Sequence, residues 1–201
     1  DGTDFDNYRG DVHNLILQID ESNRLICAYH ETSPDDIDYL RIRVFNATGQ
    51  FMASWNMNGP ERDELSIKSL VYFGNGRFVL LTNLWYLGPE TQELRARFFE
   101  LQGTSLDATT DFITVHDFGQ VGLAYDGPAC AAPLPRAQGD AFRSVWMHKE
   151  EIIAKTCARD GTISEAMVIE PNRGVSYSNA ILAANGLGDE SLVAEASEGT
   201  G

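Results

Sequence analysis

One strand pattern occurs three times along this chain, and its spacing constrains the fold more than any other feature. The three copies are Leu40–Phe45, Leu94–Phe99 and Ile152–Cys157. Each copy is followed four residues later by a glycine, at Gly49, Gly103 and Gly161. The starting positions differ by 54 and 58 residues (94 − 40 and 152 − 94). A period of this length indicates an array in which each repeat is one supersecondary unit.

Each copy is the third strand of a longer unit, because other strand-like runs surround it at matching distances. The expected first strands are Leu15–Ile19, Ser69–Phe73, Gly122–Tyr125 and Asn179–Ala184. The expected second strands are Leu25–Tyr29, Phe78–Thr82, Phe142–Trp146 and Leu192–Ala196. The expected fourth strands are Phe51–Trp55, Phe112–Val115 and Ala166–Ile169. Helical periodicity is almost absent. The sequence therefore predicts an all-β, β-propeller-like array of four-stranded antiparallel blades, three complete and one partial.

The fourth unit contains only two expected strands. The predicted blades cover about 12–58, 66–118, 121–171 and 175–201, so that residues 1–201 form one propeller-like domain or a propeller fragment. The missing strands have three alternative sources. One is the N-terminal stretch Thr3–Tyr8, which would supply one strand; the others are another chain or further sequence.

The third unit carries an insertion, Pro128–Gln138, between its expected first and second strands. Its prolines exclude a central strand, so we expect a long loop. Long loops in compact repeats are more often functional than idle. Arg136 within this loop is therefore a candidate ligand-binding residue.

The third unit also carries a resemblance. Leu123–Gly127 ends in Ala-Tyr-Asp-Gly, Val145 and Trp146 end the next strand, and Ala158–Thr162 reads Ala-Arg-Asp-Gly-Thr. This pattern resembles a family of divergent β-propeller repeats with blades of about fifty residues. The Trp-Asp signature of WD40 repeats and the Asp box of sialidases are both missing from the sequence. The resemblance implies a secreted or cell-surface protein and no particular ligand.

The charge, apolar content and cysteine count of the chain limit the kinds of partner and site that we expect. The net charge of −15 and the pI near 4.5 repel phosphate backbones, so we expect no nucleic-acid partner. No apolar run reaches the roughly 18 residues of a membrane span. Cys27, Cys130 and Cys157 match no zinc pattern and no dense disulfide framework. They are either buried thiols or one disulfide with a spare thiol.

The most regular polar feature is the basic residue at the fourth position of each repeated strand, at Arg43, Arg97 and Lys155. Side chains alternate along a strand, so these residues point away from their apolar neighbours. We expect them to extend into solvent on the outer part of each blade, where they discourage edge pairing. The alternative is a ring of cations around one face.

Other candidate sites rest on residue type and position. Trp85 and Tyr86 follow a second strand, where we expect a loop whose aromatic rings stack on a sugar, anchor a protein or cover the blade edge. Asp35, Asp36 and Asp38 form an acidic cluster compatible with calcium, with His30 and Glu31 as further candidate ligands. Asn46 begins an Asn-Ala-Thr glycosylation triplet in an expected turn.

No catalytic or cofactor motif outranks these structural interpretations. We therefore expect a non-catalytic binding or assembly module, extracellular or at the cell surface, that recognises a protein or a carbohydrate through loops on one rim. Two alternatives stay open. One is a glycan-active enzyme, similar to propeller glycoside hydrolases, with acidic residues in a central channel. The other is a structural subunit that completes its blades with another chain.

Overall fold

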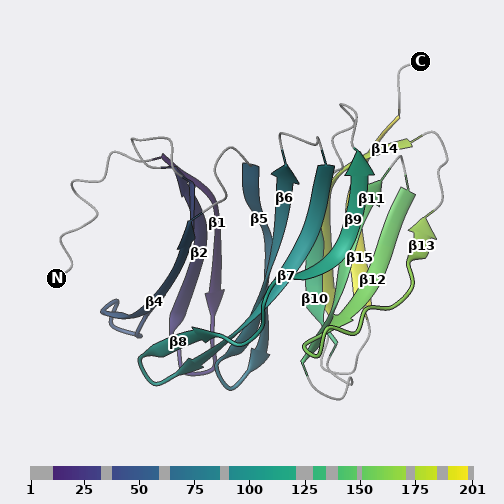
Figure 1. The fold of residues 1–201 in the computed structure, drawn as a ribbon. Helices are drawn as coiled ribbons and strands as arrows, with labels where there is room; N and C mark the ends of the chain where they lie inside the picture. The colour runs from purple at the N-terminus through teal and green to yellow at the C-terminus, as the bar shows by residue number, and fades with distance from the viewer. Residues whose placement is uncertain are drawn as a thin grey trace. The chain divides into compact units, whose positions relative to one another are not determined.

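The computed structural model describes residues 11–32, 38–58, 64–86, 91–120, 129–134, 140–148, 151–170, 175–184 and 190–198. This part of the chain contains fifteen β-strands and no helix, which confirms the predicted all-β class (Figure 1). Among the described residues, none forms a helix with the length and hydropathy needed to cross a membrane. The chain divides into two compact units, residues 1–120 and 121–201.

Unit 1 begins with an antiparallel meander of four strands, which we call sheet I. Its strands are β1 (Asp11–Ile19), β2 (Leu25–Thr32), β3 (Asp38–Phe45) and β4 (Phe51–Asn58), paired in chain order. All four expected strands of the first unit are present, and each is longer than the sequence pattern indicated. A bulge between His13 and Ile16 places Asn14 in the left-handed region, with φ of +52°.

The second sheet of unit 1, sheet II, contains one strand that the sequence pattern did not show. Its strands are β5 (Glu64–Gly74), β6 (Arg77–Tyr86), β7 (Thr91–Gln102), β8 (Ser105–Ala108) and β9 (Ile113–Gln120). β8 pairs with the end of β7 and β9 pairs with its beginning, so the two together fill the fourth position of the sheet. Between them, Thr109 donates its amide to the Phe98 carbonyl (2.9 Å), and the Thr110 hydroxyl accepts from the Phe98 amide (3.1 Å).

Unit 2 contains sheet III and a separate hairpin. Sheet III consists of β10 (Cys130–Pro133), β11 (Ala141–His148), β12 (Glu151–Ala158) and β13 (Met167–Glu170). The hairpin consists of β14 (Val175–Ala184) and β15 (Glu190–Glu198). The division of residues 1–201 into blades at the boundaries given above stays a prediction.

Strand β10 corrects one prediction, since it lies inside the segment Pro128–Gln138 that we expected to be a loop. Among the described strands, β10 lies at the edge of the sheet, pairs with β11 alone and ends at Pro133, in agreement with the exclusion of a central strand. The expected first strand of this unit, Gly122–Tyr125, lies outside the described residues.

Three hairpin turns have the same hydrogen-bond pattern, and two of them contain the regular turn glycines Gly49 and Gly161. The turns are Asp20–Arg24, Asn46–Gln50 and Ala158–Thr162. In each, the fourth residue donates its amide to the first carbonyl, and its φ is positive: +57° at Asn23, +81° at Gly49 and +88° at Gly161. Glycine adopts this conformation without steric cost, and asparagine tolerates it.

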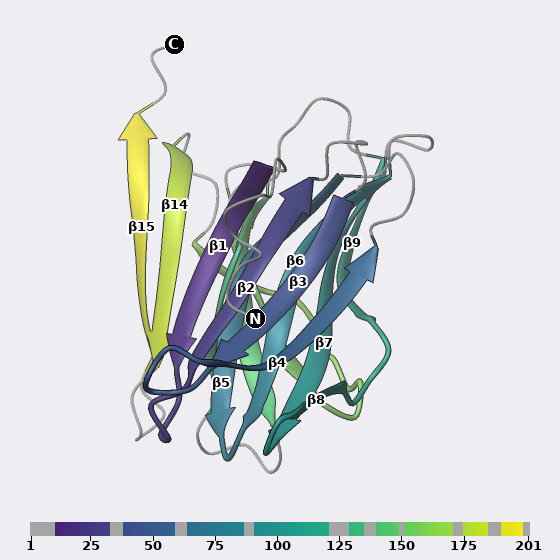
Figure 2. The same cartoon turned by 90° about the vertical axis from the view of Figure 1, so that its left-hand side faces the viewer.

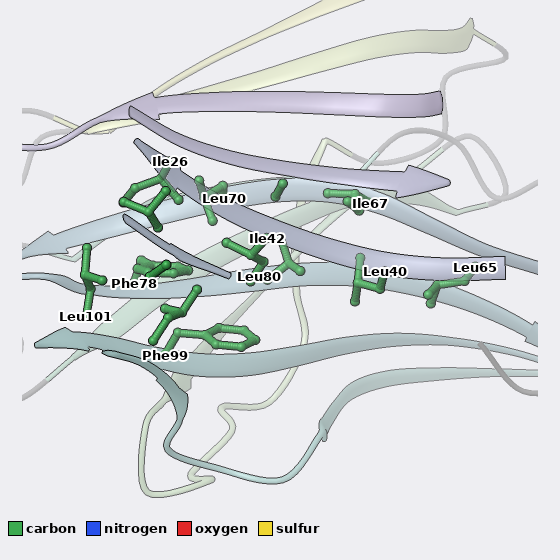
Figure 3. Close-up of a cluster of buried hydrophobic side chains, with 14 of the residues drawn as sticks. Ile26, Leu40, Ile42, Leu65, Ile67, Leu70, Phe78, Leu80, Phe99 and Leu101 are labelled. Atoms are coloured by element: carbon green, nitrogen blue, oxygen red, sulfur yellow. The ribbon is translucent and has the colours of Figure 1, made fainter. Parts of the chain in front are cut away.

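The core of unit 1 forms where the faces of sheets I and II pack together. The inner face of sheet I consists of Ile26, Ala28, Leu40, Ile42 and Val44, all fully buried. Opposite them, sheet II contributes Leu65, Ile67, Leu70, Phe78 and Leu80 (Figure 3). Full burial of one such aliphatic or aromatic side chain stabilises the fold by about 1.5–3 kcal/mol.

Arg97 corrects the prediction that the repeated basic residues extend into solvent. Its guanidinium carbon lies 5.1 Å from the Trp55 ring centroid and 5.0 Å from that of Phe112. Its Nε donates to the Thr110 carbonyl (3.0 Å), and Trp55 packs edge-on against Phe99 (4.9 Å). Arg97 therefore joins sheet I to sheet II through cation–π contacts. The equivalent Arg43 and Lys155 are also half-buried rather than exposed.

In unit 2, the hairpin packs one of its faces on sheet III. Leu182 of β14 is 9% exposed and lies in a cluster with Val145, Met147, Ile152 and Ala154. Leu192 of β15, directly opposite Leu182, packs against the same cluster.

A polar contact joins the β1–β2 turn to the β5–β6 turn. The Glu21 carboxylate accepts from the Tyr72 hydroxyl and from the Asn75 amide (2.7 Å). The Tyr72 oxygen in turn accepts from the Gly76 amide (2.9 Å). Burial, and then the bond to Glu21, raise the pKa of Tyr72 to about 12. The hydrogen bond from Tyr72 is the largest cause that lowers the pKa of Glu21.

We expect Gly76→Ala to destabilise unit 1 clearly more than Gly74→Ala. Both glycines have positive φ, +76° and +93°, so both substitutions introduce backbone strain of about 1–3 kcal/mol. Only at Gly76 does an added Cβ meet a neighbour, the Leu101 carbonyl oxygen at 2.4 Å, whereas the space at Gly74 is open. Urea denaturation of the two variants measures the difference. Equal losses would show that the contact with Leu101 relaxes without cost.

The phenol of Tyr72 predicts a stability difference at alkaline pH. Its pKa in the folded protein is about 12, against an ordinary tyrosine pKa of 10.0, so the folded state holds this proton more tightly. The resulting stabilisation is present below pH 10 and is lost as the pH rises toward 12. Tyr72→Phe removes this dependence, so wild type loses more stability than the variant between pH 10 and 12. Denaturation curves at several alkaline pH values test this, and parallel losses would contradict it.

Candidate functional site

The candidate site lies at the end of unit 1 where β2 and β6 end and where β3 and β7 begin. We call it the arginine rim, and it consists of Glu31, Tyr39, Arg41, Tyr86, Glu93 and Arg95. These six residues form two groups of the same composition, one on each sheet. Each group contains one arginine, one glutamate and one tyrosine.

In sheet I, Arg41 holds the group together. Its Nε lies 2.9 Å from Glu31 Oε2, which is an ion-pair distance, although the N–H direction falls outside hydrogen-bond geometry. Its guanidinium carbon lies 4.9 Å from the centroid of the Tyr39 ring. Glu31 and Tyr39 are directly opposite each other on β2 and β3. The Glu31 side chain is only 4% exposed, so the paired arginine compensates a carboxylate that has lost its water.

In sheet II, Arg95 has the same role. Its Nε donates to Glu93 Oε2 (2.6 Å), and its Nη2 donates to the Tyr86 hydroxyl. The guanidinium carbon lies 5.4 Å from the centroid of the Tyr86 ring. The hydroxyl of Thr114 on β9 donates to the same Glu93 oxygen (3.3 Å). Arg95 and Glu93 remain about one quarter and one fifth exposed, so solvent reaches this group.

The two arginines occupy the same position of the repeated strand, the second residue of Leu40–Phe45 and of Leu94–Phe99. Their partners do not share positions. Glu93 stands where sheet I has Tyr39, and Tyr86 lies two residues beyond the counterpart of Glu31. Sequence comparison of the repeats missed the groups for this reason, because only the arginine recurs in register. The signal that was available is the arginine at the second position of the first two repeated strands, Leu40–Phe45 and Leu94–Phe99.

The third repeat departs from this arrangement. Ile153 occupies the position of the two arginines and pairs with Trp146, which is fully buried. The Arg–Glu–Tyr group therefore occurs on two of the three sheets that carry the repeated strand, within the described residues.

Other described carboxylates with arginine partners belong to other elements. Asp20 pairs with Arg24 (2.5 Å) in the β1–β2 turn. Asp140 pairs with Arg159 (3.3 Å), and Glu190 pairs with Arg143 (2.8 Å), both in unit 2. A carboxylate held by a guanidinium is an acceptor with a fixed orientation, and it also fixes the remaining N–H donors of the arginine.

The structure treats the two aromatic candidates differently. Trp85 and Tyr86 are the last two residues of strand β6, paired with Gln92 and Thr91, so their expected loop position is wrong. Consecutive strand residues point to opposite faces. Tyr86 therefore joins the arginine rim, whereas half-buried Trp85 lies on the other face of sheet II. Trp85 Nε1 is buried and has no hydrogen-bond partner among the described residues.

The predicted calcium ligands are not brought together by the described part of the structure. Asp35 and Asp36 lie outside the described residues, as does Arg136. Asp38 is the first residue of β3, opposite Thr32, and its side chain is outside the described set. Of the further candidates, Glu31 pairs with Arg41, and His30 lies against the His13 ring (5.8 Å). The described residues contain no group of three side chains suited to a metal ion. The calcium site stays a prediction.

Asn46 lies in the β3–β4 turn, as expected, and its side chain is part of the turn. Its Oδ1 accepts from the amides of Thr48 (3.0 Å) and Gln50 (2.9 Å), and its Nδ2 donates to the Gln50 side chain (3.1 Å). Glycosylation at Asn46 stays a prediction.

The three cysteines are free thiols in strands β2, β10 and β12. Burial raises the pKa of Cys130 to about 11 and that of Cys157 to about 12. Burial also raises the pKa of Cys27, against the lowering effect of Arg43. A thiol with a raised pKa is a weak nucleophile at neutral pH, so none of the three is suited to nucleophilic catalysis.

Comparison with known proteins bears on the fold. No protein-family model matches the sequence. No curated protein matches it either. Among solved structures, the Hadza microbial sialidase Hz136 matches with a TM-score of 0.51 at 10% identity, covering 83% of this chain and 32% of the sialidase. The chain thus spans about a third of the sialidase that it matches. The sialidase is a propeller, and the four-stranded antiparallel sheets of this chain are compatible with propeller blades.

We expect Cys157 to react with iodoacetamide far more slowly than Cys27 in the folded protein. Cys157 is fully buried and its thiolate is scarce below a pKa of about 12, whereas Cys27 is half-buried. Mass spectrometry of peptides after timed labelling at pH 8 measures both rates. In denaturant the two rates should become equal, which serves as the control. Rapid labelling of Cys157 in the native protein would contradict its placement.

Proposed function

We propose that this protein is a non-catalytic glycan-binding module, built from propeller-type blades, three complete and one partial, and located outside the cell. The observation that carries the proposal is the pair of Arg–Glu–Tyr groups on the arginine rim. Both groups lie at the same end of unit 1, on neighbouring sheets.

The chemistry of each group suits a sugar. The aromatic ring offers an apolar surface for C–H groups, while the guanidinium and carboxylate offer donors and acceptors in fixed orientations. Because each arginine is already held by its own glutamate, little side-chain freedom is lost on binding. The name of the structurally similar sialidase adds support for a glycan ligand. A protein ligand is the competing class, because tyrosine and arginine are also enriched at protein interfaces.

The state of the carboxylates supports binding rather than hydrolysis. A general acid in a glycosidase needs a raised pKa and a second carboxylate across the substrate. On the rim, Glu31 and Glu93 are each held by an arginine. In the part of the chain that the structure describes, hydrogen bonds, mainly from Tyr72 and Thr162, lower the pKa of Glu21 and that of Asp160.

A glycan-active enzyme is the second candidate, and the likeness to a sialidase is the observation that favours it. In that case the acidic residues in a central channel perform the chemistry. Incubation of the protein with the glycans that it binds, followed by chromatography of the products, separates the two functions.

We expect Arg95→Gln and Tyr86→Phe to weaken glycan binding. A glycan array identifies the best ligand, and titration calorimetry then gives the dissociation constant. Loss of a hydrogen bond to a charged group costs about 1.5–3 kcal/mol, so Arg95→Gln should raise this constant about tenfold or more. Tyr86→Phe keeps the ring and should have a smaller effect.

Arg24→Gln is the matched control, because Arg24 also pairs with a carboxylate but lies in the β1–β2 turn at the other end of sheet I. It should leave the dissociation constant unchanged. Three results would overturn the proposal: no binding to any glycan, binding that ignores both rim variants, or cleavage of the bound glycan.

A further inference from the structure

The outward face of sheet I, turned away from sheet II, exposes a row of large apolar side chains. Val12, Leu15, Leu17 and Ile19 of β1 are 53–63% exposed, and Phe51 of β4 is 58% exposed. Figure 2 shows sheet I from this side, with β1, β2, β3 and β4 in front. Four exposed aliphatic side chains on one strand are unusual for a surface that makes no contact with another protein or domain.

The strand register shows what this face corresponds to in sheet II. Leu17, Cys27 and Arg43 lie in one cross-strand row, and Leu70, Leu80 and Arg97 form the equivalent row of sheet II. Ile19, Leu25 and Phe45 form the next row, whose counterpart is Tyr72, Phe78 and Phe99. In sheet II these rows are buried in the cluster with the inner face of sheet I, with Leu80 and Phe78 at 0% exposure. By this register, the outward face of sheet I corresponds to the face of sheet II on which sheet I packs. It is therefore suited to pack against the face of another sheet.

In unit 1 the rows of sheet II are covered by the inner face of sheet I, which was defined above. One face of the β14–β15 hairpin is apolar, as the inner face of sheet I is, but it is exposed. Its Leu182 and Leu192 face sheet III, so the opposite face carries Ile181 and Val193. These two side chains are directly opposite each other and each is 67% exposed.

We propose that the outward face of sheet I docks the β14–β15 hairpin of a second copy of this chain, head to tail. The contact repeats the sheet-on-sheet packing that already joins sheet I to sheet II, with Leu17 and Ile19 against Ile181 and Val193. Such a heterologous contact closes into a ring when the rotation allows it and otherwise forms a chain. Because each copy carries a net charge of −15, added salt should strengthen the association by screening the repulsion.

The test uses two single variants, Leu17→Asp and Ile181→Asp, with sedimentation velocity as the measurement. Both positions are more than half exposed, so neither change should unfold a chain. Wild type should show concentration-dependent association that rises with salt. Each variant alone should weaken it by about tenfold or more in dissociation constant, since burial of one aliphatic side chain contributes about 1.5–3 kcal/mol.

An equimolar mixture of the two variants provides the decisive result. The Ile181→Asp chain keeps an intact sheet I face and the Leu17→Asp chain keeps an intact hairpin, so the mixture should form a dimer that neither variant forms alone. Thr104→Asp, in the exposed β7–β8 turn, is the control and should associate as wild type does. A wild type that stays monomeric, self-association that survives in Ile181→Asp, or a mixture without dimers would overturn the proposal. Glycan binding at the rim is measured separately and does not decide it.

Discussion

Packing of the inner face of sheet I against sheet II is the interaction on which the rest of unit 1 depends. Each strand alternates its side chains between two faces, and here both faces of a sheet carry apolar rows. One row, from Ile26 to Val44, finds its cover within the unit, whereas the row from Leu17 to Ile19 does not. A sheet that is apolar on both faces cannot be a terminal layer without exposing one of them. Unit 1 thus has a buried core between its two sheets and an exposed apolar surface on the outward face of sheet I.

The arginine rim depends on the same register. Arg41 lies on the outward face of sheet I and Arg95 on the face of sheet II that meets sheet I, and in both places the strand pairing fixes which side chains lie beside the arginine. Glu31 shows the cost of such a position, because burial removes most of the water from a side chain that is only 4% exposed. Arg41 supplies the opposite charge at ion-pair distance, and its guanidinium carbon lies 4.9 Å from the centroid of the Tyr39 ring. Each element of the group is thus stabilised by its neighbour.

The sequence predicted the repeated strands and their turns because these depend on local chemistry: alternation along one strand and a residue with positive φ at Gly49 or Gly161. It failed where the outcome depends on distant pairing. Strand β10 exists because β11 offers it an edge, and β8 because β7 extends to Gln102. Arg97 was expected in solvent, and only the approach of Trp55 from the other sheet shows why it is half-buried. For the site, the sequence indicated Tyr86 but neither Arg95 nor Glu93, since their contact follows from register.

The third repeat bears on whether the arginine groups serve the fold or a ligand. Sheet III has the same meander and the same turn as sheet I, yet it places Ile153 and Trp146 where sheet I places Arg41 and Tyr29. An apolar pair at this position is therefore compatible with the fold, and it avoids the desolvation of a buried ion pair. The two groups also have the same composition from different strand positions. In sheet I the glutamate is on β2 and the tyrosine on β3, whereas in sheet II the tyrosine is on β6 and the glutamate on β7. A scaffold requirement would impose one arrangement on all three sheets, whereas recognition requires only that the same three side chains meet at the rim.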